Sequence, residues 1–365
     1  MIRIAIIGVG NCASSLVQGI AYCRAKGDQA IGVPFPTIGP YKPSDVDVVC
    51  AFEVDARKVG RDLADAVFAE PNCTTQFWPD IAKTGVIVRR GPTLDGVSAF
   101  MAENPPDVSF QVSDEREPTE SEVVAALSNV GVVINFLPVG SQLATEFYAN
   151  CAIKAGAAFV NGIPVFIASD PKWAARFADA GLPVLGDDFK AQLGATILHR
   201  SLMHLFDQRG GKVDRTYQLN VGGNTDFLNM MSPGRLSSKR ISKTEAVQSA
   251  YKERLQDSQI RVGPSDYVAW LNDQKVAYIR LEGQLFGGVP VNMETRLSVE
   301  DSPNAAAMAL IAIRCARIAL DRGLSGSIDE VCGFIFKSPP KQIDDTIAHD
   351  AILQFSERAA ASDSK

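Results

Sequence analysis

The first residues that could do chemistry are the glycines of a turn near the amino terminus. Residues 4–7 form a continuous apolar run, typical of a parallel strand buried on both faces, and Gly8 and Gly10 follow it directly. Residues 13–20 are small or apolar and predict a helix. In such a strand–turn–helix unit the first glycine makes the turn, the second admits a pyrophosphate, and Ala13 permits close helix packing. The turn predicts a nucleotide site; the alternative is an ordinary tight turn.

An acidic residue follows the second apolar strand. Residues 47–52 predict this strand, which ends at Glu53, with Asp55 two residues further on. In this fold an acid at the strand end holds a ribose hydroxyl of the dinucleotide, and Glu53 is better placed for this than Asp55. The alternative is a solvated turn acid. An acid also favours NAD over NADP because it would repel a 2′-phosphate, although Arg57 lies nearby.

Three further predicted strands, at residues 130–137, 157–161 and 184–185, also end in polar residues. Ligands of open α/β sheets bind outside the carboxyl ends of the strands, so these ends should meet at one site. The predicted cofactor-binding residues are Gly8, Gly10, Asn11, Cys12, Ala13, Glu53, Asp55, Asn135, Pro138, Ser141, Asn161, Asp187 and Asp188.

The second half of the chain has a different pattern. Residues 216–221 alternate between polar and apolar side chains, as in a sheet with one open face, and residues 222–226 form a loop rich in backbone donors. Further strands are predicted at residues 260–262, 276–282 and 289–299, and a helix of small side chains at residues 305–322.

Two lysines lie close together in this half. Ser242 and Glu245 have the spacing of a capping box, so a helix should begin near Lys243. A lysine in a first turn faces the positive end of the helix dipole, where its charge is unfavourable. Lys243 is therefore either an exposed lysine that the fold tolerates or one retained for chemistry, with Lys239 just upstream.

Composition excludes several classes of protein. With 42 acidic and 36 basic residues and a net charge of −6, the chain offers no basic surface for nucleic acid. No apolar run approaches the roughly 20 residues that cross a bilayer, and the seven cysteines form no CxxC pair. We therefore expect a reduced, cytoplasmic protein that binds neither nucleic acid nor membrane. His199 and His204 lack metal-ligand spacing and are expected to be structural.

These patterns predict an α/β protein with a Rossmann-type doubly wound parallel sheet and an α+β unit with a mostly one-sided sheet. We expect a dinucleotide-binding domain at residues 1–190, a catalytic and oligomerisation domain at 191–300, and a segment at 301–365 that packs back on the first domain. Smaller expectations are a helix at residues 55–68, a short strand at 86–88, and a helix ending at residue 127 and capped near Thr119.

Several of these stretches together resemble the myo-inositol-1-phosphate synthase family, in its short prokaryotic form. The similar segments run from residue 8 to about residue 340 and so cover nearly the whole chain. The glycine turn alone would suit any Rossmann enzyme, whereas the full set is specific. The segments are GVGNCASSLVQG, NFLPVGS, VNGIPVFIASDP, GDDFKAQLGAT, LNVGGNTDFLNM, SKRISKTEAV, GPSDYVAWLNDQKVAYIRLEG, EDSPNA and FKSPP.

The resemblance implies a reaction. The family converts D-glucose 6-phosphate to 1D-myo-inositol 3-phosphate, also named inositol 1-phosphate, with NAD that is regenerated in each turnover. Carbon 5 is oxidised, a C6 proton is lost, the enolate attacks the C1 aldehyde, and C5 is reduced again. Oxyanions develop at O5 and O1, so such a site needs cations and preorganised donors rather than a strong nucleophile. The resemblance also implies a homotetramer.

The resemblance further implies roles for individual residues. Lys239 and Lys243 would lie near the reacting O5 and O1. The other implied catalytic residues are cations for the substrate and acids that orient hydroxyls or lysines: Lys275, Lys337, Asp187, Asp226 and Asp301. The implied substrate-binding residues are Lys190, Gly222, Gly223, Asn224 and Lys275.

The chain departs from the longer members of the family at two places. Ile163 and Val165 occupy part of a serine-rich stretch, so its polar contacts do not transfer, and Lys190 does not lead into the polar run of the longer enzymes. Family members differ in needing a divalent metal, ammonium or neither, and no ligand cluster in the sequence selects one. The alternative functions are a net NAD(P)-dependent oxidoreductase of a sugar phosphate or homoserine-type substrate, and a nucleotide-sensing scaffold.

Overall fold

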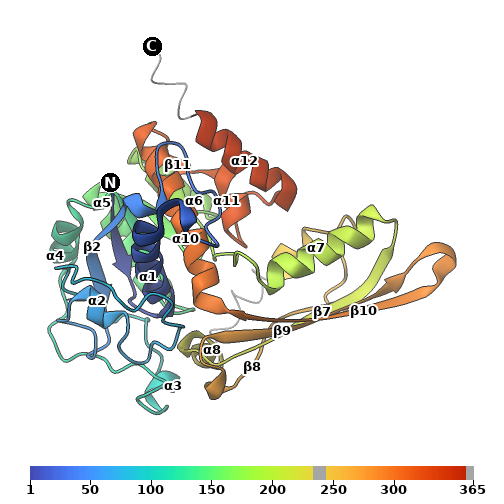
Figure 1. The fold of residues 1–365 in the computed structure, drawn as a ribbon, viewed down its shortest axis with the longest axis horizontal. Coiled ribbons are helices and arrows are strands. Elements are labelled where there is room, and N and C mark those ends of the chain that lie inside the picture. The colour runs from blue at the N-terminus through green and yellow to red at the C-terminus, as the bar shows by residue number, and fades with distance from the viewer. Residues whose placement is uncertain (233–243, 359–365) are drawn as a thin grey trace.

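The computed structural model describes residues 1–232 and 244–358, and these residues form two sheets (Figure 1). Within them, a parallel sheet of seven strands has the order β11-β6-β5-β4-β1-β2-β3, and a sheet of four strands has the order β10-β9-β7-β8. The strand order of the first sheet reverses at β1, as in doubly wound folds, so the predicted α/β class is confirmed.

The first sheet is apolar on both faces because helices cover both. Its strands are β1 (Ile2–Ile7), β2 (Val46–Glu53), β3 (Arg89–Arg90), β4 (Val132–Asn135), β5 (Ala158–Asn161), β6 (Pro183–Leu185) and β11 (Gly326–Ser327). One face packs on α1 (Asn11–Lys26), α10 (Asp301–Asp321) and α11 (Asp329–Ile335). The other packs on α4 (Glu120–Leu127), α5 (Gln142–Ala155) and α6 (Pro171–Asp179).

The second sheet is covered on one face by α7 (Ala195–Gln208), which packs on β7 and β9 in a shared apolar core. In Figure 1 its long strands extend away from the first sheet with α7 lying along them. Its edge strand β10 is half-buried or exposed at every position, which leaves a long uncovered surface. The strands are β7 (Lys212–Gly222), β8 (Ile260–Tyr267), β9 (Gln274–Gln284) and β10 (Pro290–Glu300).

The remaining described helices are short or lie near the C-terminus. Residues 244–248 are helical. The others are α2 (Leu63–Ala66), α3 (Ala99–Ala102), α8 (Thr225–Met230) and α12 (Asp345–Arg358), with 3₁₀ turns at Gly27–Gln29, Pro43–Asp45, Ala269–Leu271 and Phe286–Gly288.

Helix α10 joins the two sheets. It follows β10 directly, and its apolar side chains belong to the same core as β1 and α1. Among the described helices it is the one long and apolar enough to cross a bilayer, which we did not expect, but 67% of its apolar window is buried inside the protein. Strand β11 then pairs with β6, so residues after 300 complete the first sheet. The division at residues 190 and 300 stays a prediction.

Two of the smaller expectations are wrong. The helix predicted at residues 55–68 is only four residues long, because Asp55 accepts the backbone N–H of Arg57 at 2.9 Å and so competes with helix formation. The strand predicted at residues 86–88 lies outside the sheet, because the backbone of Val88 pairs with Gly60 and Arg61 instead. The capping box of α4, between Thr119 and Glu122, is confirmed.

Candidate active site

An open cavity lies between the two sheets, at the carboxyl ends of the first sheet's strands. Its walls come from the β1–α1 turn, the end of β2, the loops after β4, β5 and β6, and from β7, α8, β9 and α10. The predicted residues that line it are Gly8, Gly10, Asn11, Cys12, Glu53, Pro138, Asp188, Asn224, Asp226, Lys275, Asp301 and Lys337.

The glycine turn combines a backbone that favours glycine with open space before α1. Gly8 has a φ of +88°, and a Cβ there would lie 2.9 Å from the carbonyl oxygen of Phe136. Gly10 precedes α1, and a Cβ at this position would meet nothing within 4 Å. The first turn of α1 carries no acidic residue, so its N–H groups and partial positive charge are available to an anion.

Glu53 connects the end of β2 to this turn. Its carboxylate accepts the N–H of Val9 at 2.8 Å, of Val54 at 2.7 Å and of Asp55 at 3.3 Å, and it lines the cavity. A carboxylate has about four acceptor positions, so one position remains for a ribose hydroxyl. The carboxylate is thus held in place beside the glycine turn.

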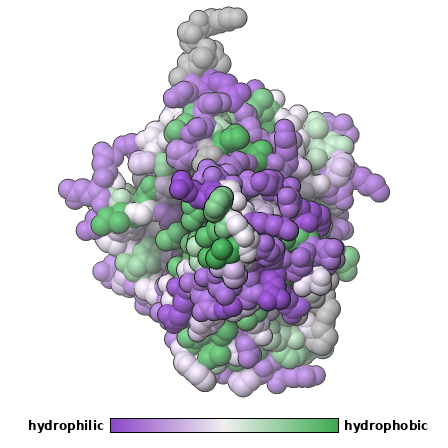
Figure 2. Space-filling model, turned by 90° about the vertical axis from the view of Figure 1, so that its right-hand side faces the viewer, coloured by the Kyte–Doolittle hydropathy of each residue, from purple (hydrophilic) through white to green (hydrophobic). Residues whose placement is uncertain are grey.

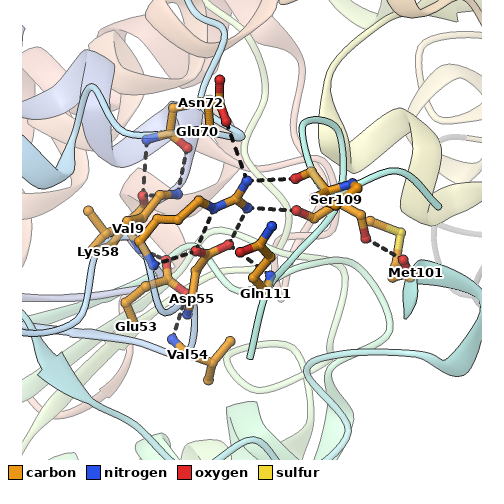
Figure 3. A network of polar contacts seen from close by, with 12 residues as sticks. Val9, Glu53, Val54, Asp55, Lys58, Glu70, Asn72, Met101, Ser109 and Gln111 are labelled. Atoms are coloured by element: carbon orange, nitrogen blue, oxygen red, sulfur yellow. Dashed lines mark hydrogen bonds and ion pairs between the residues drawn. The ribbon is translucent and has the colours of Figure 1, made fainter. Parts of the chain in front are cut away.

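Asp55 points away from the cavity, into a polar network that Figure 3 shows. It is fully buried, and the Arg57 guanidinium donates to both of its oxygens, at 2.9 and 2.6 Å. Arg57 also donates to the carbonyls of Pro106 and Ser109. Neither Asp55 nor Arg57 lines the cavity, and the guanidinium is engaged in holding the loop around Ser109.

Sequence reasoning missed Lys58, which lies under the glycine turn. It is 1% exposed, and its Nζ donates to the carbonyl of Val9 at 2.9 Å and to Oδ1 of Asn72 at 2.8 Å (Figure 3). Burial lowers the pKa of Lys58, while Glu53 and Asp55 oppose that shift. A lysine five residues after the strand-end acid is the signal that could have found it.

Two lysines in the cavity are each held beside a carboxylate. Lys275, on β9, forms an ion pair with Asp301 in the first turn of α10. Lys337 donates to Asp188 at 2.7 Å, and its own N–H bonds to the carbonyl of Asp188 at 2.7 Å. Asp226, in the first turn of α8, lines the same cavity. The predicted lysines Lys275, from the second sheet, and Lys337, from the segment after α11, thus share one cavity.

Asp273 is a second residue that sequence reasoning did not assign to the site. It is fully buried beneath these pairs and accepts from Asn224 Nδ2 at 2.8 Å and from the N–H and hydroxyl of Ser302 at 3.0 and 2.9 Å. Burial and the nearby Asp301 raise the pKa of Asp273 to about 6. Its position two residues before Lys275, a predicted site residue, is the signal in the sequence that could have identified Asp273 as part of the site.

Several predicted cofactor residues lie behind the cavity wall. Asn135 donates to Asn161 at 2.9 Å, and Asn161 donates to Asp187 at 2.8 Å. Asp187 accepts from backbone N–H groups of Ile167 and two neighbours, and burial raises its pKa to about 6. This chain supports the loop after β5, and Asp187 is fully buried and does not line the cavity. The predicted cofactor residues that are buried and do not line the cavity are Ala13, Asp55, Asn135, Ser141, Asn161 and Asp187.

Three predicted substrate-binding residues also lie away from the cavity. Lys190 is fully buried and donates to the carbonyl of Gly333 and to Asp345 at 2.9 Å; burial lowers its pKa to about 8. A Cβ on Gly222 would lie 2.4 Å from the ring of Phe227, and one on Gly223 would lie 2.5 Å from a backbone oxygen. Close packing therefore accounts for both glycines.

Lys239 and Lys243 lie outside the described residues, as does the Ser242 end of the predicted capping box. Among the residues that the structure does describe, no three His, Cys, Asp or Glu side chains are grouped to hold a metal ion.

Comparison with known proteins identifies the relatives of this chain. Residues 194–302 match the model of the myo-inositol-1-phosphate synthase family. The chain is 51% identical to inositol-3-phosphate synthase of Mycolicibacterium smegmatis, over 98% of both chains. The chain belongs to the myo-inositol-1-phosphate synthase family. It is also 50% identical to inositol-3-phosphate synthase of Corynebacterium glutamicum, over 97% of this chain and 98% of that protein.

Solved structures of the synthase family have the same fold. A myo-inositol-1-phosphate synthase-related protein from Thermotoga maritima, 27% identical, matches with a TM-score of 0.77 over 98% of both chains. Inositol-3-phosphate synthase of Caenorhabditis elegans, 15% identical, matches in fold with a TM-score of 0.70 over 98% of this chain and 85% of that one. The segment matched by the family model includes Asn224, Lys275 and Asp301 of the cavity.

Proposed function

We propose that this member of the synthase family is an isomerase that converts D-glucose 6-phosphate to 1D-myo-inositol 3-phosphate with NAD regenerated in each turnover. The observation that carries the proposal is the single cavity in which a dinucleotide turn meets two lysine–carboxylate pairs. Full-length relatives named inositol-3-phosphate synthase, at about half identity, support the same reaction.

The residues of the turn fit NAD. When bound, NAD supplies reversible hydride transfer. Gly8, Gly10 and the amino end of α1 would hold its pyrophosphate, and Glu53 a ribose hydroxyl. The engagement of Arg57 with Asp55 supports NAD over NADP, because this guanidinium is then not available for a 2′-phosphate.

The lysines of the cavity suit a reaction with two developing oxyanions and a phosphate. Lys275 and Lys337 would stabilise negative charge on substrate oxygens, with Asp301 and Asp188 holding each ammonium group in position. Asp226 would accept from substrate hydroxyls or from a lysine. Lys239 and Lys243 complete the proposed cation set. Asp187 and Lys190 would act as supports of neighbouring loops.

The reaction is tested directly. Purified enzyme is incubated with glucose 6-phosphate and a catalytic amount of NAD, and the products are separated and identified. We expect a phosphate-bearing cyclitol without net NADH. Stoichiometric NADH without cyclisation would instead support the oxidoreductase alternative.

A lysine variant tests whether the cations act in the chemistry. Lys243→Ala should abolish turnover and leave NAD binding intact, because the proposed role of Lys243 concerns substrate oxygens only. Normal turnover in this variant would contradict the assignment. A scaffold that only senses nucleotide would bind NAD and be indifferent to the change.

We further propose that the protein is a cytoplasmic homotetramer assembled through the second sheet. The uncovered strand β10 supports this, as do three apolar side chains at the β9–β10 turn: Leu285, Phe286 and Val289 are 47%, 100% and 60% exposed. Figure 2 shows an apolar cluster projecting from this end of the molecule, surrounded by polar surface. Exposed apolar surface of this kind is typical of protein interfaces.

A further inference from the structure

The ion pair between Asp55 and Arg57 also holds the loop that follows β3. Asp55 is fully buried and the Arg57 side chain is 17% exposed, and the guanidinium donates from Nε and Nη2 to the two carboxylate oxygens. It also donates from Nη1 to the carbonyl of Pro106 at 2.6 Å and from Nη2 to that of Ser109 at 2.7 Å. Four of the five N–H groups of the guanidinium are thus used, two of them on this loop.

These contacts lie on both sides of Phe110. The carbonyl of Ser109 accepts from the guanidinium, and the N–H of Gln111 donates to Oδ2 of Asp55 at 3.1 Å (Figure 3). Phe110 lines the cavity, as Glu53 does, whereas the residues that hold Phe110 do not. The sequence did not predict Phe110 as a site residue. A polar network behind the cavity wall therefore flanks an aromatic side chain that forms part of the wall.

The backbone on the amino side of Phe110 depends on Arg57. Gln111, on the other side, would stay in place without the guanidinium, because its carbonyl accepts the N–H of Ala56 at 2.6 Å. Residues 98–109 all belong to the described part of the chain, and their hydrogen bonds to other described segments come from Arg57, while the rest lie within the loop itself. Loss of the guanidinium would therefore release one side of Phe110 and leave the other side anchored.

The wall of the cavity around Phe110 suits a flat apolar group. Val54 lines the cavity with Phe110 and directly follows Glu53, and its carbonyl accepts the N–H of Ser113 at 2.8 Å, which keeps this loop beside the end of β2. In Rossmann domains the acid at this strand end holds the ribose of the adenosine half, so the attached base lies beside it. Contact with an aromatic ring stabilises such a base.

We propose that Phe110 contacts the adenine ring of NAD and that Arg57 is a positioning residue, which holds the backbone on one side of Phe110. This inference rests on the proposed function for the identity of the cofactor. Arg57 acts through Phe110 and does not touch the cofactor. A cofactor that is regenerated in each turnover has to stay bound, and contacts at its unreactive adenine end add affinity without engaging the nicotinamide.

Two substitutions separate the aromatic ring from its support. Phe110→Ala should weaken the binding of NAD, and of ADP-ribose, which carries the adenine without the nicotinamide, by about ten-fold. Arg57→Lys keeps a cation for Asp55, but an ammonium group has three N–H donors and cannot make four hydrogen bonds. We expect it to keep the stronger charge pair and lose a loop carbonyl, which should weaken both ligands about three-fold. Arg61→Lys, at an exposed position nearby, is the control and should bind like wild type.

A double-mutant cycle tests whether Arg57 acts through Phe110. Adding Arg57→Lys to Phe110→Ala should cause no further loss of ADP-ribose affinity in calorimetric titration. Multiplying losses, or wild-type affinity in Phe110→Ala, would overturn the proposal.

The kinetics separate positioning from a general loss of structure. Arg57→Lys should raise the KM for NAD and leave kcat at saturating NAD unaltered, whereas a general loss of structure would lower kcat. If the wild-type enzyme binds ADP-ribose but forms no cyclitol phosphate, the proposed function fails, and the binding series alone decides the roles of Phe110 and Arg57. A wild-type enzyme that does not bind ADP-ribose would overturn the inference itself.

Discussion

At the scale of single residues, the cavity holds its cations beside carboxylates. Lys337 is 13% exposed and pairs with Asp188, and Lys275 is 16% exposed and pairs with Asp301. A partly buried ammonium group is stabilised in its charged form by a neighbouring carboxylate and is held in one orientation. Such a pair presents a charged ammonium group to the cavity in a fixed position.

Replacing Lys337 should impair the reaction far more than the fold. We expect Lys337→Met to reduce kcat/KM for glucose 6-phosphate by about a hundred-fold or more, the loss typical of removing one preorganised donor to a developing oxyanion. The measurement is the rate of inositol phosphate formation, with NAD affinity recorded alongside. Lys341→Met, at an exposed position of the same loop, is the control. Equal rates in the two variants would contradict the assignment.

Lys58 should act on the cofactor rather than on the substrate. Its amino group fixes the Val9 carbonyl in the glycine turn, so Lys58→Met should weaken NAD binding by about ten-fold, the value of one or two hydrogen bonds. Fluorescence titration with NAD measures this. The exposed Lys83→Met variant serves for comparison. Unchanged NAD affinity in Lys58→Met would show that the turn holds its shape without the lysine.

At this scale, the sequence predicted which residue types belong to the site better than it predicted which side chains face the cavity. It selected both Lys190 and Lys337, and only Lys337 lines the cavity. Nothing local in the sequence showed that Asp345, 155 positions later, pairs with Lys190 and holds it in the interior. In the same way, a strand-end Asp187 reads like a ligand residue until the loop after β5 is seen donating to it.

At the scale of elements, Asp273 joins three of them. It lies directly before β9, accepts from Asn224 at the cap of α8, and accepts from Ser302 in the first turn of α10. This carboxyl group therefore fixes how the second sheet meets the long helix that returns to the first. Any change in its charge acts on the junction beside the Lys275–Asp301 pair.

The charge of Asp273 should be visible in the pH dependence of stability. Its pKa in the folded protein, about 6, is above the value of 3.8 for a free aspartate. The folded state therefore retains the proton longer, and the contribution of Asp273 to stability declines as pH rises from about 4 to about 6. The free energy of unfolding of wild type relative to Asp273→Asn should fall by about 3 kcal/mol over this interval and then stay constant. Chemical denaturation at several pH values measures it, and a pH-independent difference would contradict it.

Elements with one dominant physical cause were predicted well. The apolar runs of β1, β4 and β5 are buried on both faces, and such runs have few alternatives to a central parallel strand. Segments whose structure depends on hydrogen bonds between side chains and backbone were predicted poorly. Residues 55–68 are an example, because Asp55 accepts a backbone N–H and only four residues are helical. The start of α10 at Asp301, four residues before the predicted start, was missed because the loop-like residues Ser302, Pro303 and Asn304 form its first turn.

At the scale of the whole molecule, the proposed tetramer would assemble through the second sheet. We expect the protein in solution to have four times the 39.2 kDa mass of one chain. Charges at the β9–β10 turn should disrupt assembly, so Phe286→Glu with Val289→Glu should yield smaller species by light scattering. Ile347→Glu, at an exposed apolar position outside this sheet, should not. A wild-type monomer would rule out the proposed assembly.

The return of the chain to its first sheet also has a consequence for how the protein is made. Strand β11 pairs with β6 across more than 140 positions of sequence, and α10 covers one face of the first sheet together with α1 and α11. During synthesis α10 and β11 leave the ribosome last. Until then, the part of the first sheet that is already made has an apolar face that these elements do not yet cover. Such late, non-local closure slows folding and exposes aggregation-prone surface. The proposed dinucleotide site would therefore form only after nearly the whole polypeptide has been released, and a fragment ending near residue 190 should be insoluble rather than a small NAD-binding protein.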